Sequence, residues 1–174
     1  GDTKGGKDLK CTMSRGMTFV ADVAFDDVVK EAGPKDKEMS SVSMVVLPGG
    51  MGGAQTFAKS SALLSVLKHR KAKGLWYAAI CASPAQVLLP NELLPKKATC
   101  YPALREKIAK CVDEGSVANR VVVDADAKCV TSQGPGTTLE FAVRLVALLR
   151  GNEVAKEVAK KLLLNFLSSE EAKL

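Results

Sequence analysis

Two short apolar segments, each followed at once by a turn, constrain the fold of this chain more than any other feature. The first is Ser43–Leu47, which ends at Pro48-Gly49-Gly50, and the second is Leu75–Ile80, which ends at Cys81. Apolar runs of this length, bounded by turn residues, are typical of strands buried on both faces. Between them, the apolar spacing of Ala54–Arg70 predicts an amphipathic helix. A strand, a helix and a second strand in this order favour parallel pairing with a right-handed crossover.

The rest of the chain continues this alternation of strands and helices. Further strands are expected at Ala98–Tyr101, Val121–Asp124 and Cys129–Ser132, and further helices at Ala103–Cys111, Thr137–Leu149 and Glu153–Leu167. Directly after Cys81 we expect a short helix, with Ser83 as its N-cap and Pro84 at its first position. The pattern therefore predicts an α/β fold.

The length of 174 residues, with 47% hydrophobic and 25% charged residues, predicts one globular domain over residues 1–174. The uncharged stretch Gly74–Asn91 contains Pro84 and Pro90, so it is interpreted as core interrupted by turns and not as a membrane span. The five cysteines form an odd set without a CxxC pair, so we expect reduced thiols and no zinc knuckle. No signal peptide is recognised, and a cytoplasmic location is expected.

The net charge of +6 has a largely local origin. No Asp or Glu occurs between Glu38 and Glu92, whereas Lys68, Arg70 and Lys71 lie close together near the end of a predicted helix. We interpret these cations as a solvated group that complements the helix dipole, because no nucleic-acid-binding motif accompanies them. His69, the single histidine, lies within this group, so a surface role is expected and a Cys–His dyad is not.

Three turns follow strands of the predicted sheet and are expected to meet at the edge formed by the carboxyl ends of the strands. Ligands of open parallel sheets bind beyond this edge. The three turns are Pro48-Gly49-Gly50, the turn at Cys81, and Gln133-Gly134-Pro135-Gly136. A sulfur at the start of a helix faces unpaired N–H groups and a dipole that contributes roughly 0.3–2 kcal/mol, which favours a thiolate. The alternative is that Cys81 is an inert small core residue, as cysteines in apolar strands often are. No GxGxxG and no pair of histidines occurs, so neither a cofactor nor a metal is expected.

Three segments resemble the ThiJ/PfpI superfamily, in the branch of the Parkinson-disease-associated protein deglycase. They are VVLPGGMGGAQ (Val45–Gln55), AAICASPA (Ala78–Ala85) and TSQGPGTTLEFA (Thr131–Ala142), and the likeness extends from about Cys11 to the last helix. The resemblance implies a flavodoxin-like three-layer sandwich with a mostly parallel sheet and a cysteine nucleophile elbow. It also implies a homodimer that works without a cofactor.

The same resemblance assigns site roles to particular residues. Cys81 matches the oxidisable nucleophile, and the pocket around it is assigned to Gly49, Gly50, Ala82, Tyr101, Pro135 and Arg15. The glycines and Ala82 would direct backbone N–H groups at the sulfur, and Pro135 would lie in the turn beside the pocket. Arg15 matches an arginine near the dimer contact and the site.

Two positions depart from the family pattern. Gln133 stands where a basic residue is expected, and Tyr101 stands where some members have a histidine implicated in glyoxalase chemistry. A phenol, with a reference pKa near 10, is a poor base at neutral pH, so proton transfer would need another group.

A larger departure concerns the N-terminal strand and helix of the family, which carry a glutamic acid that hydrogen-bonds the cysteine. No position of this chain matches that acid. We expect that the domain lacks its N-terminal portion, since a parallel sheet without a central strand exposes unpaired backbone edges. A separate segment of the same protein could complete it; the alternative is a protein that lacks the acid.

Two functions from different classes are consistent with this reading. The first is a cysteine-dependent glyoxalase or deglycase that acts on methylglyoxal or its adducts during oxidative stress, through a hemithioacetal on Cys81. The alternative is a redox-sensing chaperone whose Cys81 oxidises to a sulfinate, without significant turnover. Partners would be a small 2-oxoaldehyde and a second copy of the chain, with no nucleic acid and no membrane.

Overall fold

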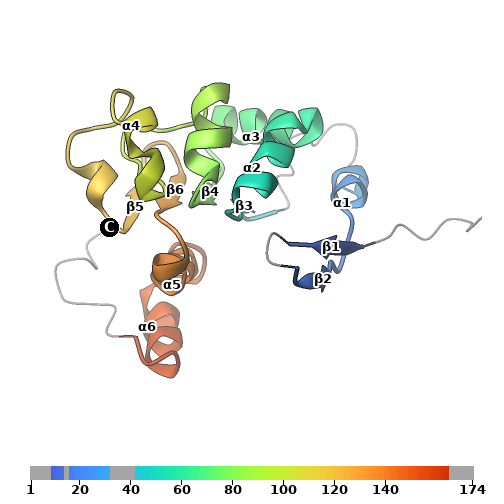
Figure 1. The fold of residues 1–174 in the computed structure, drawn as a ribbon. Coiled ribbons are helices and arrows are strands. Elements are labelled where there is room, and N and C mark those ends of the chain that lie inside the picture. The colour runs from blue at the N-terminus through green and yellow to red at the C-terminus, as the bar shows by residue number, and fades with distance from the viewer. Residues whose placement is uncertain (1–8, 14–15, 32–41, 165–174) are drawn as a thin grey trace, which may run out of the picture.

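The computed structural model describes residues 9–13, 16–31 and 42–164. A four-stranded sheet lies at the centre of this part of the chain (Figure 1). Its strands are β3 (Val45–Leu47), β4 (Tyr77–Ile80), β6 (Cys129–Ser132) and β5 (Val121–Asp124), in this spatial order. The strands β3, β4 and β6 are parallel, and β5 is antiparallel to β6. Parallel pairing of β3 and β4 confirms the expectation from the two apolar segments.

Helices cover both faces of this sheet. One face packs against α2 (Met51–Lys59) and α3 (Ser61–Lys73), and the other packs against α5 (Thr138–Arg150), which in turn contacts α6 (Asn152–Lys161). In β4, Ala79 belongs to the first core and Ala78 to the second, because successive strand residues point to opposite faces. The predicted three-layer arrangement with a mostly parallel sheet is confirmed.

Shorter elements complete the described chain. They are the antiparallel pair β1 (Lys10–Thr12) and β2 (Thr18–Val20), α1 (Phe25–Glu31), α4 (Arg105–Ile108), a π-helical turn at Pro84–Leu88, and 3-10 turns at Leu89–Asn91, Pro102–Leu104, Ser116–Ala118 and Pro135–Thr137. Within these described ranges, no helix has both the length and the apolar character needed to cross a membrane.

The prediction of one helix over Ala54–Arg70 is wrong, because the segment contains two helices with a break at Ser60. The N–H of Ser60 donates to the carbonyl of Phe57 (3.1 Å), and its hydroxyl accepts from the N–H of Leu63 (3.3 Å). Ser60 thus ends α2 and caps the N-terminus of α3, a role that serine side chains favour.

Three further boundaries differ from the sequence prediction. Ala98–Tyr101 has no regular secondary structure, because two of its N–H groups donate to the hydroxyls of Ser116 and Thr131 instead of to a neighbouring strand. The helix expected at Ala103–Cys111 is reduced to a 3-10 turn and α4. At the C-terminus, α6 ends at Lys161, and positions 165–167 of the expected helix lie outside the described residues.

Arg70 corrects the interpretation of the basic group as solvated. Its side chain is fully buried. Its guanidinium donates to the carbonyl oxygens of Trp76 (3.0 Å), Val42 (2.9 Å) and Ser43 (3.1 Å). Arg70 therefore joins the end of α3 to the residues that lead into β3 and β4.

Candidate active site

Cys81 follows β4 directly and forms a sharp turn in the backbone. Its φ angle is +66°, in the left-handed region that a residue with a side chain seldom adopts. Two backbone hydrogen bonds hold this conformation: the N–H of Cys81 donates to the carbonyl of Ser132 (3.0 Å), and its carbonyl accepts from the N–H of Tyr101 (2.8 Å). Strained backbone that the surrounding structure over-determines clusters at functional sites, which makes Cys81 the candidate nucleophile.

Gly49, in the first glycine turn, lies against Cys81. A Cβ atom at Gly49 would be 2.5 Å from the Cβ of Cys81 and 3.2 Å from its Sγ. Only a residue without a side chain fits this approach. The turn after β3 therefore borders the sulfur, as predicted.

The second glycine turn also reaches the sulfur, and it does so through Gly134. A Cβ atom at Gly134 would be 3.9 Å from the Sγ of Cys81 and 3.4 Å from Cδ2 of Tyr101. The side chain of Tyr101 is 43% exposed, so it borders the opening of the site instead of filling the core. The structure thus brings Gly49, Gly134 and Tyr101 together around Cys81.

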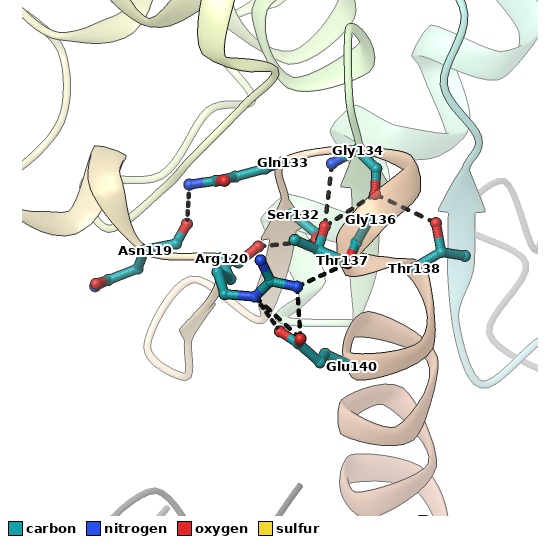
Figure 2. Close-up of polar contacts among 9 residues, drawn as sticks. All are labelled: Asn119, Arg120, Ser132, Gln133, Gly134, Gly136, Thr137, Thr138 and Glu140. Atoms are coloured by element: carbon teal, nitrogen blue, oxygen red, sulfur yellow. Dashed lines mark hydrogen bonds and ion pairs between the residues drawn. The ribbon is translucent and has the colours of Figure 1, made fainter. Parts of the chain in front are cut away.

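Hydroxyl groups fix the backbone of the second turn, as Figure 2 shows. The hydroxyls of Ser132 and Thr137 are 2.6 Å apart. Thr137 Oγ1 also accepts from the N–H of Gly134 (3.1 Å). Because Ser132 ends β6 and Thr137 precedes α5, these bonds set the position of Gly134 between the strand and the helix.

An ion pair supports the same turn from the outside. The guanidinium of Arg120 bonds both carboxylate oxygens of Glu140, with a shortest distance of 2.7 Å, and its NH2 group donates to the carbonyl of Gly136 (2.7 Å; Figure 2). Bidentate pairing fixes orientation better than a single contact does. Gln133, in place of the expected basic residue, donates to the carbonyls of Ala118 and Asn119 and so anchors the start of the turn.

Ser83 does not cap the following helix, so that prediction is wrong. Its hydroxyl is buried and donates to the carbonyl of Pro48 (2.6 Å), in the first glycine turn. This bond joins the segment after Cys81 to the segment before Gly49. Pro84 does begin the π-helical turn, as expected.

The three cysteines of the core region differ in accessibility. Cys81 is half-buried, whereas Cys100 and Cys129 are fully buried. The pKa of Cys100 is raised to about 11, mainly by burial; Arg105 opposes this change, and electrostatic interaction with Cys81 adds to it. Burial also raises the pKa of Cys129. Both buried thiols are therefore protonated, and unreactive, near neutral pH.

This difference predicts a selective reaction with iodoacetamide. At about pH 8, well below the raised pKa of Cys100, we expect alkylation of Cys81 while Cys100 and Cys129 stay unmodified. Peptide mass spectrometry after timed quenching measures each site separately. In denaturant, all five cysteines should react. Alkylation of Cys100 as fast as that of Cys81 in the folded protein would contradict the prediction.

The other predicted site residues occupy varied positions. Gly50 precedes α2 with a φ of +92°, Ala82 is buried directly after Cys81, and Pro135 is exposed at the start of its 3-10 turn. Arg15 lies outside the described residues. The roles given to these four residues stay predictions.

Sequence reasoning did not assign a site role to Gly134, although it singled out the turn that contains it. It also gave none to Ser132 and Thr137, whose hydroxyls carry no distinctive spacing. His69 lies on α3, where its Nδ1 is 2.7 Å from the carbonyl oxygen of Ser65. In the part of the chain that the structure describes, no three His, Cys, Asp or Glu side chains gather closely enough to hold a metal ion.

The sequence and the fold around this cysteine are similar to those of known proteins. The sequence profile of the DJ-1/PfpI family matches residues 3–148. The chain belongs to the DJ-1/PfpI family. This confirms the resemblance carried by the three quoted segments.

Relatives in this family match most of the chain. Protein DJ-1 homolog B of Arabidopsis thaliana is 40% identical over 156 residues, which are 89% of this chain and 32% of the plant protein. The solved structure of Toxoplasma gondii DJ-1, oxidized, superposes with a TM-score of 0.77 and 37% identity over 92% of this chain and 80% of that chain. The flavodoxin-like α/β fold is thus confirmed.

A third relative has an activity in its name. The glutathione-independent glyoxalase DJR-1.2 of Caenorhabditis elegans is 32% identical over 160 residues, which are 90% of this chain and 75% of the worm protein. The chain spans about a third of the length of the Arabidopsis relatives, 32% of homolog B and 36% of homolog A.

Proposed function

We propose that this protein is a cofactor-free glyoxalase or deglycase that uses Cys81 to act on methylglyoxal or its adducts. The observation that carries the proposal is the position of Cys81, half-buried on a left-handed turn and bordered by Gly49 and Gly134. The name of the C. elegans relative supports a glyoxalase reaction in particular.

The proposed reaction begins when the sulfur of Cys81 adds to the aldehyde carbon of methylglyoxal, and the carbonyl oxygen takes up a proton to give a hemithioacetal. A proton then moves from the former aldehyde carbon to the neighbouring carbon, and the hydroxyl proton of the hemithioacetal moves to the ketone oxygen. The ketone is thus reduced to an alcohol, and the former aldehyde carbon becomes the carbonyl of a thioester. The thioester that results is hydrolysed by water to lactate and the free thiol. Methylglyoxal and water are thus converted to lactate without an external oxidant or reductant.

The two glycine turns give this reaction its geometry. Because no side chain stands at Gly49 or Gly134, the backbone of both turns lies close to the sulfur. The exposed ring of Tyr101 borders the same opening and can orient the substrate through its hydroxyl. Tyr101 is not proposed as the base, because a phenol is a poor base at neutral pH.

The test is methylglyoxal consumption, with lactate formation, by the intact protein at neutral pH. The wild type is expected to form lactate. In Cys81→Ser the rate of lactate formation is expected to fall to the rate without enzyme, because a serine hydroxyl is a much weaker acid and nucleophile than a cysteine thiol. Cys111→Ser is the matched control, since Cys111 is an exposed cysteine remote from the turn at Cys81 in sequence. Equal activity in Cys81→Ser and the wild type would contradict the proposal.

A second candidate is a redox-sensing chaperone, and the accessibility of the thiols favours it as well. Among the cysteines of the core region, Cys81 is open to peroxide while Cys100 and Cys129 are buried. In this case the protein is expected to form no lactate. Peroxide is expected to add two oxygen atoms to the sulfur of Cys81, which gives a sulfinate that mass spectrometry of the isolated peptide would detect. Both candidates need a reactive sulfur, so alkylation of Cys81 no faster than free cysteine at about pH 6 contradicts both. A homodimer and a cytoplasmic location remain parts of the proposal.

A further inference from the structure

Arg105, the first residue of α4, has a buried donor without an acceptor. Its side chain is half-buried. Its Nε atom is buried, and no group in the described part of the chain accepts a hydrogen bond from it. Buried polar groups in proteins are nearly always hydrogen-bonded, and leaving a buried charged donor without an acceptor is costly. We therefore expect the acceptor to come from a molecule other than this part of the chain.

Hydrogen bonds connect Arg105 to the candidate site through a short stretch of backbone. The N–H of Tyr101 donates to the carbonyl of Cys81 (2.8 Å), and the N–H of Leu104 donates to the carbonyl of Tyr101 (2.8 Å). The N–H of Arg105 donates to the carbonyl of Pro102, in the same 3-10 turn. Arg105 thus lies one helical turn after Tyr101, whose ring borders the opening at Cys81.

Apolar contacts hold the backbone that carries Arg105. Leu104 is partly buried against the core, and Ile108 is fully buried in it. Because α4 is held on both sides of Arg105, the guanidinium is restricted to the surroundings of this helix. Its place near the opening is therefore a fixed feature of the fold.

The charge of Arg105 acts on the same part of the molecule as Cys81. The pKa of the Cys100 thiol is raised mainly by burial; Arg105 lowers this pKa, and Cys81 raises it. Both groups therefore lie within electrostatic range of one buried sulfur atom. A positive charge at this place attracts anions to the neighbourhood of Cys81.

The geometry of a guanidinium indicates which anion it would bind. Its N–H donors form a planar fork that matches the two oxygens of a carboxylate, and the unpartnered Nε of Arg105 is one of these donors. We propose that Arg105 binds the carboxylate of small molecules that react at Cys81. With respect to substrates, the inference rests on the proposed function, and it favours methylglyoxal adducts that carry a carboxylate over neutral ones. The binding itself does not depend on turnover.

The test compares two alkylating reagents, N-iodoacetylglycine and N-iodoacetylglycinamide, which differ only in a carboxylate and a carboxamide. Both react with the intact protein at about pH 8, and peptide mass spectrometry measures the rate at each cysteine. Cys111, an exposed cysteine, is the internal reference. The ratio of the carboxylate rate to the carboxamide rate is expected to be about tenfold higher at Cys81 than at Cys111, because a charged donor strengthens a hydrogen bond.

Two matched variants test whether this preference comes from Arg105. Arg105→Gln is expected to lower the ratio at Cys81 to that at Cys111. Lys107→Gln removes one positive charge from an exposed position of the same helix, two residues away and on another face, so it should leave the ratio unchanged. The carboxamide rate checks that Cys81 stays accessible in both variants, since this reagent carries no charge.

Three outcomes would overturn the proposal: equal ratios at Cys81 and Cys111 in the wild type, an unchanged ratio in Arg105→Gln, or an equal loss in Lys107→Gln. The lactate assay separates this inference from the proposed function. A carboxylate preference without lactate formation would support the Arg105 site and contradict the proposed reaction. Lactate formation without the preference would do the reverse.

Discussion

Gly49→Ala is expected to lower lactate formation by about 100-fold or more, even though the substitution adds a single methyl group. The new Cβ atom would lie 2.5 Å from the Cβ of Cys81, which is closer than carbon atoms approach, so the turn at Cys81 has to move. A displacement of about 1 Å at a reacting group can cost about 100-fold in rate. The nearby Ile80 carbonyl oxygen, at 3.3 Å from the same methyl group, leaves no room for relief on that side.

The same change is expected to lower the free energy of unfolding by about 1–3 kcal/mol, the usual cost of inserting a methyl group into a packed region. Gly52→Ala is the matched control, because a Cβ atom at Gly52 meets nothing within 4 Å. Gly52 lies in α2, where alanine is favoured over glycine by about 0.5–1 kcal/mol, so this control should be active and slightly more stable. Chemical denaturation and the lactate assay measure both effects. An active Gly49→Ala protein would show that Gly49 does not border the sulfur.

The sequence predicted the strand before Cys81 and the turn at Cys81, because a strand followed by a turn is a local signal. The segment Leu75–Ile80 contains β4, and the turn at Cys81 follows it as expected. Parallel topology then places Gly49 and the second glycine turn at the same edge, since these turns follow β3 and β6.

Predictions failed where a polar group bonds to a partner far along the chain. The hydroxyl of Ser83 was expected to cap its own helix but bonds to Pro48, 35 residues earlier. The segment Ala98–Tyr101 was expected to pair as a strand, but two of its N–H groups donate to the hydroxyls of Ser116 and Thr131. The spacing of residue types along the sequence reflects local geometry, and a hydrogen bond to a residue far along the chain produces no such spacing.

The break at Ser60 shows a different limit. Apolar positions continue at helical spacing on both sides of it, so the pattern alone favours one helix over Ala54–Arg70. The capping bond from Leu63 to the Ser60 hydroxyl was available as a signal, because serine before a helix is a common N-cap. The position of such a boundary depends on whether one continuous helix or two helices with a cap between them has the lower free energy.

Arg70→Leu is expected to destabilise the protein by about 3 kcal/mol or more, because the carbonyls of Trp76, Val42 and Ser43 all lose the guanidinium that bonds them. A hydrogen bond to a charged group contributes about 1.5–3 kcal/mol, and the substitution removes three of them. Leucine fills part of the space but donates nothing. The basic run Leu67–Lys73 gave no hint of this role, since Arg70 is buried among exposed lysines.

The loss should extend to the candidate site, because these carbonyls belong to the segments that lead into β3 and β4, whose opposite ends hold Gly49 and Cys81. Arg150→Leu, at the exposed end of α5, is the matched control and should change stability by less than about 0.5 kcal/mol. Urea denaturation measures the stabilities, and alkylation of Cys100, which is buried in the folded state, reports local opening. A stability of Arg70→Leu equal to that of Arg150→Leu would show that the three carbonyls do not depend on the guanidinium.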